Sequence, residues 1–401
     1  MDVYILDSLL RRSEVIDKYI SLIWTERFSS YGDFELIVES NRRNRQLLKE
    51  ETYLSIGKSH RVMIIETVED QEDSEGRYIL QVKGPSLEKK LTDRALIAKV
   101  NPFTLHKSIV INDQPSLAAE EIFTMACVVG GGSTLDGNFG IILNSPLDKG
   151  ELIYGFPTQR FEFAPDYVYT HIKWLAETYG FGFRVVRIDG DPQLYFDVYN
   201  GRNRTTEQSY NDVVIFSREL GNLKNTKELR SSSLEKTVAY VYSDDSFIEV
   251  VAEGTEANLD GFDRKVVLVE VSPDSSLNPT ERHLFFVQKG KEALAGATRF
   301  SAFDGEIVKV SQYVYEENYS LGDFVELRSS DDDFTKMRVV EQIFVNDQEG
   351  FRSYPTLSLS PVVDPRTWEG WPNTLEWDDL DPSISLFWEN AGDYNSDDGI
   401  P

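Results

Sequence analysis

The sequence predicts a β-rich α+β protein of several domains, with two related tube-like β-barrels and an α/β domain inserted between them. Apolar and polar residues alternate along most segments before residue 95 and after residue 211, as in half-buried strands. Helical periodicity is concentrated in residues 100–210. Two fragments of the first region also recur in the last one. Because 401 residues exceed one ordinary core, we expect two to four domains.

The first region opens with a predicted β-hairpin over Ile20–Val38, in which apolar residues recur at every second position on both sides of a turn. The turn-forming cluster is Ser29–Asp33, and Trp24 lies on the first strand. A second hairpin is expected from Arg61–Val68 and Tyr78–Val82, followed by a short helix that begins near Ser86. This region therefore predicts a small barrel made of hairpins.

The middle region predicts two helices and a hairpin. We expect Ser116 to cap a helix that ends at Gly130, and Asp166 to cap a second helix that ends at Gly180. The inward faces are Ala118, Ile122, Met125, Ala126 and Val129 in the first, and Val168, Ile172, Leu175, Ala176 and Tyr179 in the second. The hairpin spans 181–198 around the turn Asp189-Gly190-Asp191-Pro192.

The later region returns to predicted strands, at 213–216, 237–242, 247–252, 266–271 and 305–315, with one helix expected within 281–297. The predicted domains are an N-terminal barrel (1–99), an inserted α+β domain (100–210), a second barrel with insertions (211–360) and an acidic C-terminal docking arm (361–401).

An internal repeat supports the two related barrels. Gly32-Asp33-Phe34 precedes an apolar strand and reappears as Gly322-Asp323-Phe324, again before an apolar strand. RVMIIETVEDQE (61–72) aligns without gaps to RVVEQIFVNDQE (338–349), at a constant offset of 277 residues. Both matches occur in the same order, which favours duplication over coincidence. Two similar barrels per chain would let a trimer present six similar modules around its axis.

Charge and composition restrict the function. The chain carries 68 acidic against 41 basic residues, a net charge of −27, which disfavours a nucleic-acid-binding protein because such proteins contact phosphates with Lys and Arg. The single cysteine, Cys127, permits no disulfide within the chain. The N-terminus lacks the layout of a signal peptide, and the apolar stretch 122–135 is too short to span a bilayer. We therefore expect folding in a cytoplasm and no stable membrane insertion.

No familiar catalytic motif is present in the sequence. The four histidines, His60, His106, His171 and His283, form no zinc motif, and neither a Gly-x-Ser-x-Gly elbow nor a phosphate loop occurs. We expect Cys127 to be a buried, inert thiol and His171 to be a structural or surface histidine. Asp331-Asp332-Asp333 could bind a cation weakly but is better explained as solvated charge. We predict no catalytic residue, no cofactor and no metal site.

The predicted C-terminal arm is rich in tryptophan, proline and acids. Prolines and acids favour an extended segment, and each tryptophan offers a large area to bury in a pocket. Two placements remain open: the arm wraps a neighbouring subunit or partner, or it folds back on its own barrel. The candidate interface residues are Trp368, Trp371, Trp377 and Trp388.

With these motifs the chain resembles the baseplate or tail-tip hub proteins of siphophages, also called tail-associated or minor tail proteins. That group is related to the hubs of contractile-tail baseplates and type VI secretion spikes. The fragments that carry the resemblance are SLIWTERFSSYGDFELIV (21–38), RVMIIETVED (61–70), VVIFSRELGNL (213–223), GFDRKVVLVEVS (261–272) and YSLGDFVEL (319–327).

The resemblance implies a structural protein of the virion tail tip, assembled in the host bacterial cytoplasm and not an enzyme. A homotrimeric hub would adapt the sixfold tail tube to a threefold tip and line the DNA exit channel, through which DNA passes without specific binding. The implied partners are the distal tail protein, the tape-measure protein and tip or fibre proteins. Two alternatives remain: a tail-associated cell-wall hydrolase, and a receptor- or carbohydrate-binding tail protein.

Overall fold

The computed structural model describes residues 1–72, 76–97, 99–101, 104–105, 108–128, 139–151, 156, 158–217, 219–233, 235–244, 246–252, 260–273, 278–295, 297, 300–307, 313–328, 334–348 and 350–358. These residues all belong to one compact unit, Met1–Val362. In this described part, no helix is long and apolar enough to cross a membrane.

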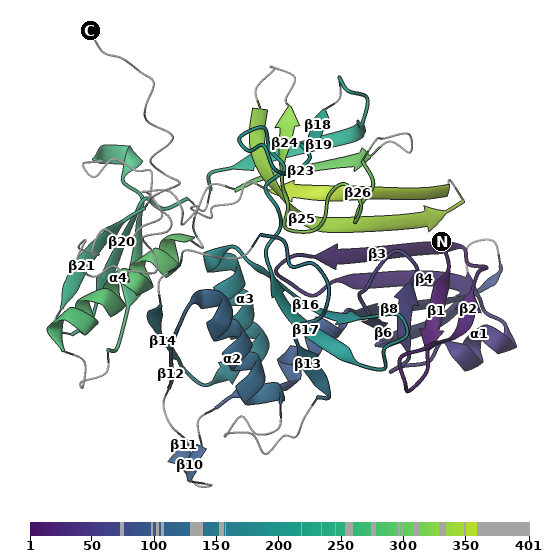
Figure 1. The fold of residues 1–401 in the computed structure, drawn as a ribbon, viewed down its shortest axis with the longest axis horizontal. Coiled ribbons are helices and arrows are strands. Elements are labelled where there is room, and N and C mark those ends of the chain that lie inside the picture. Colours follow the sequence, from purple (N-terminus) through teal and green to yellow (C-terminus); the bar gives the residue numbers. More distant parts are fainter. Residues whose placement is uncertain are drawn as a thin grey trace. The chain divides into compact units, whose positions relative to one another are not determined.

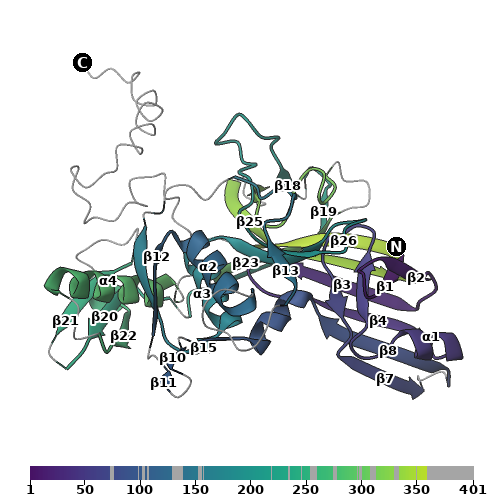
Figure 2. The same cartoon turned by 60° about the horizontal axis from the view of Figure 1, so that its bottom comes forward.

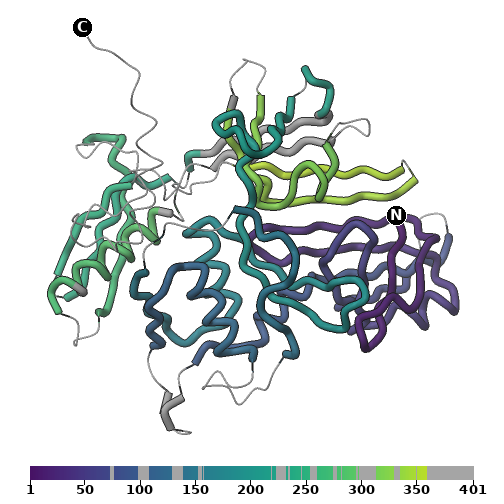
Figure 3. Tube along the Cα trace, viewed as in Figure 1, coloured from purple at the N-terminus to yellow at the C-terminus, as the bar shows by residue number. Residues whose placement is uncertain are grey.

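One long sheet joins the two ends of the described chain (Figures 1 and 3), and its main path has the order β19-β23-β26-β25-β3-β4-β8-β7. Figure 3 shows the yellow C-terminal strands lying beside the purple N-terminal ones. The strands are β3 (Ser21–Arg27), β4 (Asp33–Glu39), β7 (Thr67–Glu72), β8 (Tyr78–Pro85), β19 (Leu223–Ser231), β23 (Phe300–Ile307), β25 (Phe334–Asp347) and β26 (Gly350–Ser358).

The path consists of two four-stranded blocks with the same topology. In chain order the first block is β3, β4, β7 and β8, and it lies in the sheet as β3-β4-β8-β7. The second block is β19, β23, β25 and β26, and it lies as β19-β23-β26-β25. All neighbouring strands on the path are antiparallel. The shared strand order supports the predicted duplication.

The two predicted barrels are not closed in the described structure. Among the described strands, β7 pairs only with β8 and β19 only with β23, so the path has two open ends. The blocks instead join through β25 and β3, which pair from Glu341↔Arg27 to Asn346↔Leu22. The strands of the two blocks therefore form one open sheet, because the inner edge of each block pairs with the other block and not with its own outer strand.

The Gly-Asp-Phe half of the predicted repeat is wrong. Gly32-Asp33-Phe34 leads into β4, whereas Gly322-Asp323-Phe324 leads into β24 (Phe324–Arg328), which lies off the path beside β25 and pairs in parallel with β18 (Ile215–Ser217). The counterpart of β24 is β5 (Tyr53–Ile56), since each pairs antiparallel with the segment that leads into the next hairpin. A tight turn before an apolar strand suits both places, so the tripeptides match without being equivalent.

The second half of the repeat identifies the correct strands with the wrong register. Met63 pairs with Ser86 and Thr67 pairs with Lys83, so the five residues 63–67 lie opposite the four residues 83–86. The first strand therefore contains a bulge of one residue. β25 has the same irregularity, between Val339 and Glu341. Thr67 and Glu341 are each the first paired residue after this bulge, and they lie 274 residues apart. The ungapped alignment at 277 is therefore shifted by three residues.

A small sheet covers one face of the first block. It has the order β2-β1-β5-β6, and α1 (Arg42–Leu47) lies beside it (Figure 2). Leu22, Trp24, Leu36, Val82 and Phe344 of the long sheet form a core with apolar residues of this layer. Its strands are β1 (Val3–Leu6), β2 (Arg12–Ile16), β5 and β6 (Met63–Ile64). The opposite face of the long sheet, which carries Ile23, is not part of this core.

The inserted region contains two packed helices and a hairpin over 182–199, as predicted, together with further short strands. α3 ends at Gly180, whose φ of 72° is the left-handed conformation expected there. The predicted caps are wrong: α2 begins at Pro115 after Gln114, and α3 begins after Tyr167, because Asp166 belongs to a short strand. The elements are η1 (Leu87–Asp93), β9 (Ala95–Leu96), β10 (Lys99–Asn101), β11 (Thr104–Leu105), β12 (Ile109–Asp113), α2 (Pro115–Cys127), β13 (Ile141–Leu143), β14 (Gln159–Phe163), β15 (Asp166–Tyr167), α3 (Val168–Tyr179), β16 (Gly182–Arg187) and β17 (Leu194–Tyr199).

Residues 238–295 form a further α/β element with its own apolar cluster, within the range 211–360 that was predicted as a second barrel with insertions. The sheet has the order β21-β20-β22, and α4 packs on one of its faces through Phe286 and Leu294. The elements are β20 (Val238–Tyr242), β21 (Phe247–Val251), η2 (Gly261–Asp263), β22 (Val266–Glu270) and α4 (Pro279–Ala295), which confirms the expected helix.

Candidate functional site

The seam between the two blocks is apolar on its covered face. Trp24 of β3 faces Phe344 of β25, and both side chains are fully buried. The indole Nε1 of Trp24 donates to the Glu26 carboxylate at 3.1 Å. On the other face, Arg27 donates from Nε to Glu341 Oε1 at 2.8 Å and forms an ion pair with Asp33 at 2.6 Å. Packing and charge-assisted hydrogen bonds thus hold the two halves of the chain together.

The open edge of β7 is the counterpart of this seam. The six residues of β25 that pair with β3 are Glu341–Asn346, and the offset of 274 carries them onto Thr67–Glu72, which is the whole of β7. The shared strand order likewise makes β19, the first strand of the second block, the counterpart of β3 in the first block. On the main path of the long sheet, β7 and β19 are therefore the two strands whose outer edges remain unpaired among the described strands. Such edges are templates for pairing with another chain.

The uncovered face of the long sheet combines isoleucines with paired charges. Lys83 Nζ lies 3.0 Å from Glu35 Oε2, and Arg352 Nη2 lies 2.6 Å from Asp347 Oδ2. With the Arg27–Glu341 pair, three basic side chains of this face are each placed against a carboxylate. Each of these three cations is therefore already neutralised by a carboxylate.

A buried ion pair fixes the first block to the inserted domain. Arg61 forms an ion pair with the fully buried Glu88 and also donates to the carbonyl of Arg27 and the hydroxyl of Tyr199, each at 3.2 Å. Glu88 also accepts from the backbone N–H of Val185 at 2.8 Å. Burial lowers the pKa of Arg61, but nearby acidic groups, led by Glu88, reverse this, so the net shift is upward.

A polar cavity of about 390 Å³ lies where both blocks meet the inserted domain. Its lining includes Glu26, Arg61, Arg184, Tyr315 and Asp323. Burial raises the pKa of Glu26, although Tyr315 and Trp24 donate to it at 3.2 and 3.1 Å. The arginines are neutralised by carboxylates, as in the Arg184–Asp197 contact of 3.1 Å. These pairs make the cavity wall a structural junction.

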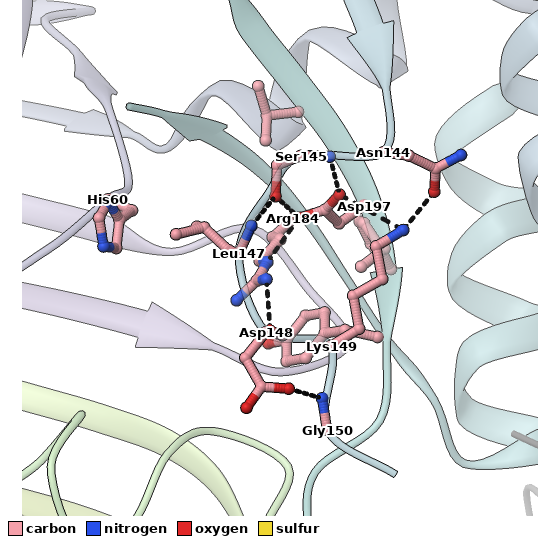
Figure 4. Close-up of polar contacts among 12 residues, drawn as sticks. His60, Asn144, Ser145, Leu147, Asp148, Lys149, Gly150, Arg184 and Asp197 are labelled. Atoms are coloured by element: carbon pink, nitrogen blue, oxygen red, sulfur yellow. Dashed lines mark hydrogen bonds and ion pairs between the residues drawn. The ribbon is translucent and has the colours of Figure 1, made fainter. Parts of the chain in front are cut away.

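Buried Asp197 fastens the loop that follows β13 (Figure 4). Its carboxylate accepts from the backbone N–H of Ser145 at 2.6 Å, from the Ser145 hydroxyl and from Arg184 Nε, while Lys149 Nζ lies 3.6 Å away. The Ser145 hydroxyl thus donates to a carboxylate that two cations already neutralise. This geometry holds the loop; it differs from the nucleophile–base arrangement of a hydrolase.

The predicted candidate residues have different outcomes. Trp368, Trp371, Trp377 and Trp388 lie outside the described residues, as do His106 and Asp331–Asp333. Cys127 is buried, and burial raises its pKa to about 12, which agrees with an inert thiol. His171 faces the carbonyl of Ala164 at 2.9 Å, and burial lowers its pKa. Within the described part, no group of three or more His, Cys, Asp or Glu side chains is arranged to hold a metal ion.

Sequence reasoning missed the open edges and the two buried carboxylates, Glu88 and Asp197. Their partners lie far away in the chain: 27 residues separate Glu88 from Arg61, and 52 separate Asp197 from Ser145. The edge strand β7 carried a usable signal, because the acidic TVEDQE has little apolar surface for a central strand.

The fold matches solved structures of tail proteins. A 43 kDa tail protein of prophage MuSo2 from Shewanella oneidensis aligns with a TM-score of 0.54 at 12% identity, covering 91% of this chain and 99% of that chain. A tail protein from Neisseria meningitidis MC58 aligns with a TM-score of 0.55 at 12% identity, covering 92% and 99%. At this identity the likeness concerns the fold alone.

Comparison of the sequence with known families identifies the chain more specifically than the fold does. No curated protein matches the chain at a significant level. The profile of the Siphovirus ReqiPepy6 Gp37-like protein family matches residues 2–355, which is most of the chain. The chain therefore belongs to the Siphovirus ReqiPepy6 Gp37-like family.

Proposed function

We propose that the protein is a structural hub of a siphophage tail tip, in which three copies form a ring that adapts a sixfold tail tube to a threefold tip. The observation that carries this proposal is the pair of four-stranded blocks with one topology in a single open sheet. Three copies would place six such blocks around the axis, so a threefold ring of chains would present the sixfold repeat of the tail tube. The open ends at β7 and β19 are the places where the sheet would continue into neighbouring copies.

The uncovered face of the long sheet would line the DNA exit channel. The other face is occupied by the small sheet and its core, so ring closure leaves the uncovered face for the lumen. The ion pairs Lys83–Glu35 and Arg27–Glu341 hold basic groups against carboxylates there. With an overall charge of −27, such a lining would repel phosphates and let DNA pass without adhesion.

The implied partners are the distal tail protein on the tube side, the tape-measure protein in the lumen and tip or fibre proteins at the far end. The C-terminal tryptophans Trp368, Trp371, Trp377 and Trp388 would dock on a neighbouring subunit or on one of these partners.

Electron microscopy of the full chain mixed with the distal tail protein of the same phage tests this proposal. We expect threefold rings stacked on sixfold rings, with a central channel. The control is the distal tail protein alone, which would give sixfold rings without the threefold layer. Particles in which single copies of the chain decorate the ring, without threefold symmetry, would contradict the hub.

A further inference from the structure

The α/β element 238–295 has a sheet with two different faces. α4 packs on one face of the sheet β21-β20-β22, where Phe286 contacts the cluster that includes Ala239 and Val241 of β20 (Figure 2). Successive side chains of a strand point to opposite faces, so Tyr240, between these two residues, lies on the other face. We call this other face, which carries Tyr240, Phe247, Glu249 and Leu268, the aromatic face.

The aromatic face exposes large apolar side chains. Tyr240 pairs with Glu249 of β21 and with Leu268 of β22, so these three side chains lie in one row across the sheet. Leu268 is 67% exposed, and Phe247, in the next row, is 60% exposed. The ring centroids of Phe247 and Tyr240 lie 5.2 Å apart. The two rings therefore form a platform on which a further ring could stack.

Polar groups have fixed positions beside this platform. Arg264 Nη2 donates to the hydroxyl of Tyr240 at 3.0 Å and to Glu249 Oε2 at 2.5 Å. The guanidinium carbon of Arg264 also lies 5.7 Å from the centroid of the Tyr240 ring. Arg264 and Glu249 together carry no net charge, but they present both donors and acceptors of hydrogen bonds. The aromatic face therefore combines apolar surface with hydrogen-bonding groups that suit a neutral ligand.

The dimensions of the aromatic face restrict its partner. Three strands of five residues cover about 17 Å by about 14 Å, or roughly 240 Å². A stable protein interface buries about 800 Å² on each partner, which is more than this face offers. A small molecule needs a concave pocket that encloses it, whereas this face is one surface of a sheet. A saccharide chain fits better, because it can lie along the sheet and place one or two of its rings on the platform.

We propose that the aromatic face binds a neutral saccharide chain, with one sugar ring stacked on Phe247 and its hydroxyls hydrogen-bonded to Glu249 and Arg264. A pyranose ring presents C–H groups on its face, which pack on an aromatic ring, and hydroxyls at its edge, which both donate and accept. One chain contains the whole aromatic face, so this role goes beyond the hub and needs no ring. A ring of three chains would present three such faces and bind a polymer more tightly.

The place of the element in the chain agrees with an added binding module. By strand order, β19 and β23 are the counterparts of β3 and β4, which are joined by the short turn Phe28–Gly32. β19 and β23 pair as far as Ser231↔Phe300, and the element 238–295 lies between these two residues in the chain. The second block thus carries a folded element where the first block has only a turn, and hairpin turns tolerate such insertions.

Binding of neutral hexasaccharides to the full chain tests the proposal. The probes are cellohexaose, maltohexaose and chitohexaose, and binding is followed by saturation-transfer NMR and titration. We expect at least one probe to bind with a dissociation constant of about 1 mM or below, and its ring protons to receive saturation from aromatic protons. Binding of none of the three probes at up to about 10 mM would overturn the proposal.

Substitution of Phe247 locates the binding site. Phe247→Ala should weaken binding about tenfold, because the stacked ring is lost, whereas Phe247→Tyr keeps an aromatic ring and should retain binding. The matched control, Tyr210→Ala, removes an aromatic side chain that is 64% exposed outside the element and should leave binding unchanged. Unchanged binding in Phe247→Ala, or an equal loss in Tyr210→Ala, would overturn the assignment to this face.

A shortened chain separates this inference from the hub. Replacing residues 232–299 with a turn of the same length as Phe28–Gly32 should abolish saccharide binding and leave the mass of the assembly, counted in chains, unchanged. If the shortened chain does not fold, the Phe247 variants decide. A full chain that forms threefold rings but binds no probe overturns this inference and leaves the hub intact. A monomeric chain that binds a probe contradicts the hub and supports this inference. If Phe247→Ala dissociates the assembly and the unaltered chain binds no probe, the face is a contact between copies and the proposal fails.

Discussion

The inner and outer edges of the two four-stranded blocks share one topology but differ in their side chains. The inner edges, β25 and β3, carry Phe344 and Trp24 and bury them within one chain. The outer edges, β7 and β19, occupy the equivalent places, and β7 carries three exposed acids, Glu69, Asp70 and Glu72. A contact that forms once during folding can be apolar, whereas one that forms between soluble copies must keep each chain from aggregating beforehand.

The largest effect is expected from breaking the inner seam. Trp24→Ala removes a fully buried indole from the core that joins β3 to β25 and should lower the free energy of unfolding by about 3–5 kcal/mol. Urea denaturation followed by circular dichroism measures this. The control is Ile23→Ala on the opposite, partly exposed face, which should cost much less. Equal losses of unfolding free energy in both variants would contradict a core that lies on only this face of the sheet.

The stability of the chain should depend nearly as strongly on the buried ion pair between Arg61 and Glu88. Glu88→Ala leaves Arg61 charged and unpaired in the interior, at a cost of about 3–5 kcal/mol. Replacing both partners, Arg61→Met with Glu88→Leu, should recover most of this loss, because no uncompensated charge remains. A double variant as unstable as Glu88→Ala would show that other contacts of Arg61 dominate.

Glu26, beside the inner seam, should make stability depend on pH. Burial raises its pKa in the folded chain, so the native state binds the proton more tightly than the unfolded state does. The contribution of Glu26 to stability is therefore favourable at low pH and declines as pH rises above about 4.5. Glu26→Gln should raise the melting temperature at about pH 7 and change it less at about pH 4. A lower melting temperature at neutral pH would contradict this.

Substitutions on the outer edge strand β7 should change the stability of the isolated chain least. Glu72→Lys on β7 alters an exposed side chain and should change the free energy of unfolding by no more than about 0.5 kcal/mol. Thermal denaturation at a low protein concentration isolates this effect from assembly. A loss comparable to that of Trp24→Ala would show that β7 is part of a buried contact within the chain.

Local patterns in the sequence predicted the elements well. The alternation around Trp24 gave the β3–β4 hairpin, and Gly180 marked the end of α3, because each depends on residues close in the chain. The caps Ser116 and Asp166 were wrong because Pro115 starts α2 and Asp166 pairs with β9. The strongest repeat fragment identified the equivalent hairpins, but its ungapped alignment lies three residues away from the register that the strand pairing gives.

Contacts between distant segments could not be predicted in this way. The join of β25 to β3 links residues more than 300 apart, and no local period reports which edge of a block stays open. The partners of Glu88 and Asp197 are set by the packing of the inserted domain on the first block, so a buried carboxylate in these stretches looks like any surface acid in the sequence. The tryptophans of the C-terminal arm remain a sequence prediction.

The mass of the full chain in solution at low ionic strength tests the central claim most directly. Light scattering coupled to size exclusion should give three times the chain mass of 45.8 kDa, because two equivalent blocks per chain complete a sixfold ring with three copies. A mass of one chain at every soluble concentration, or a stable dimer, would contradict the account.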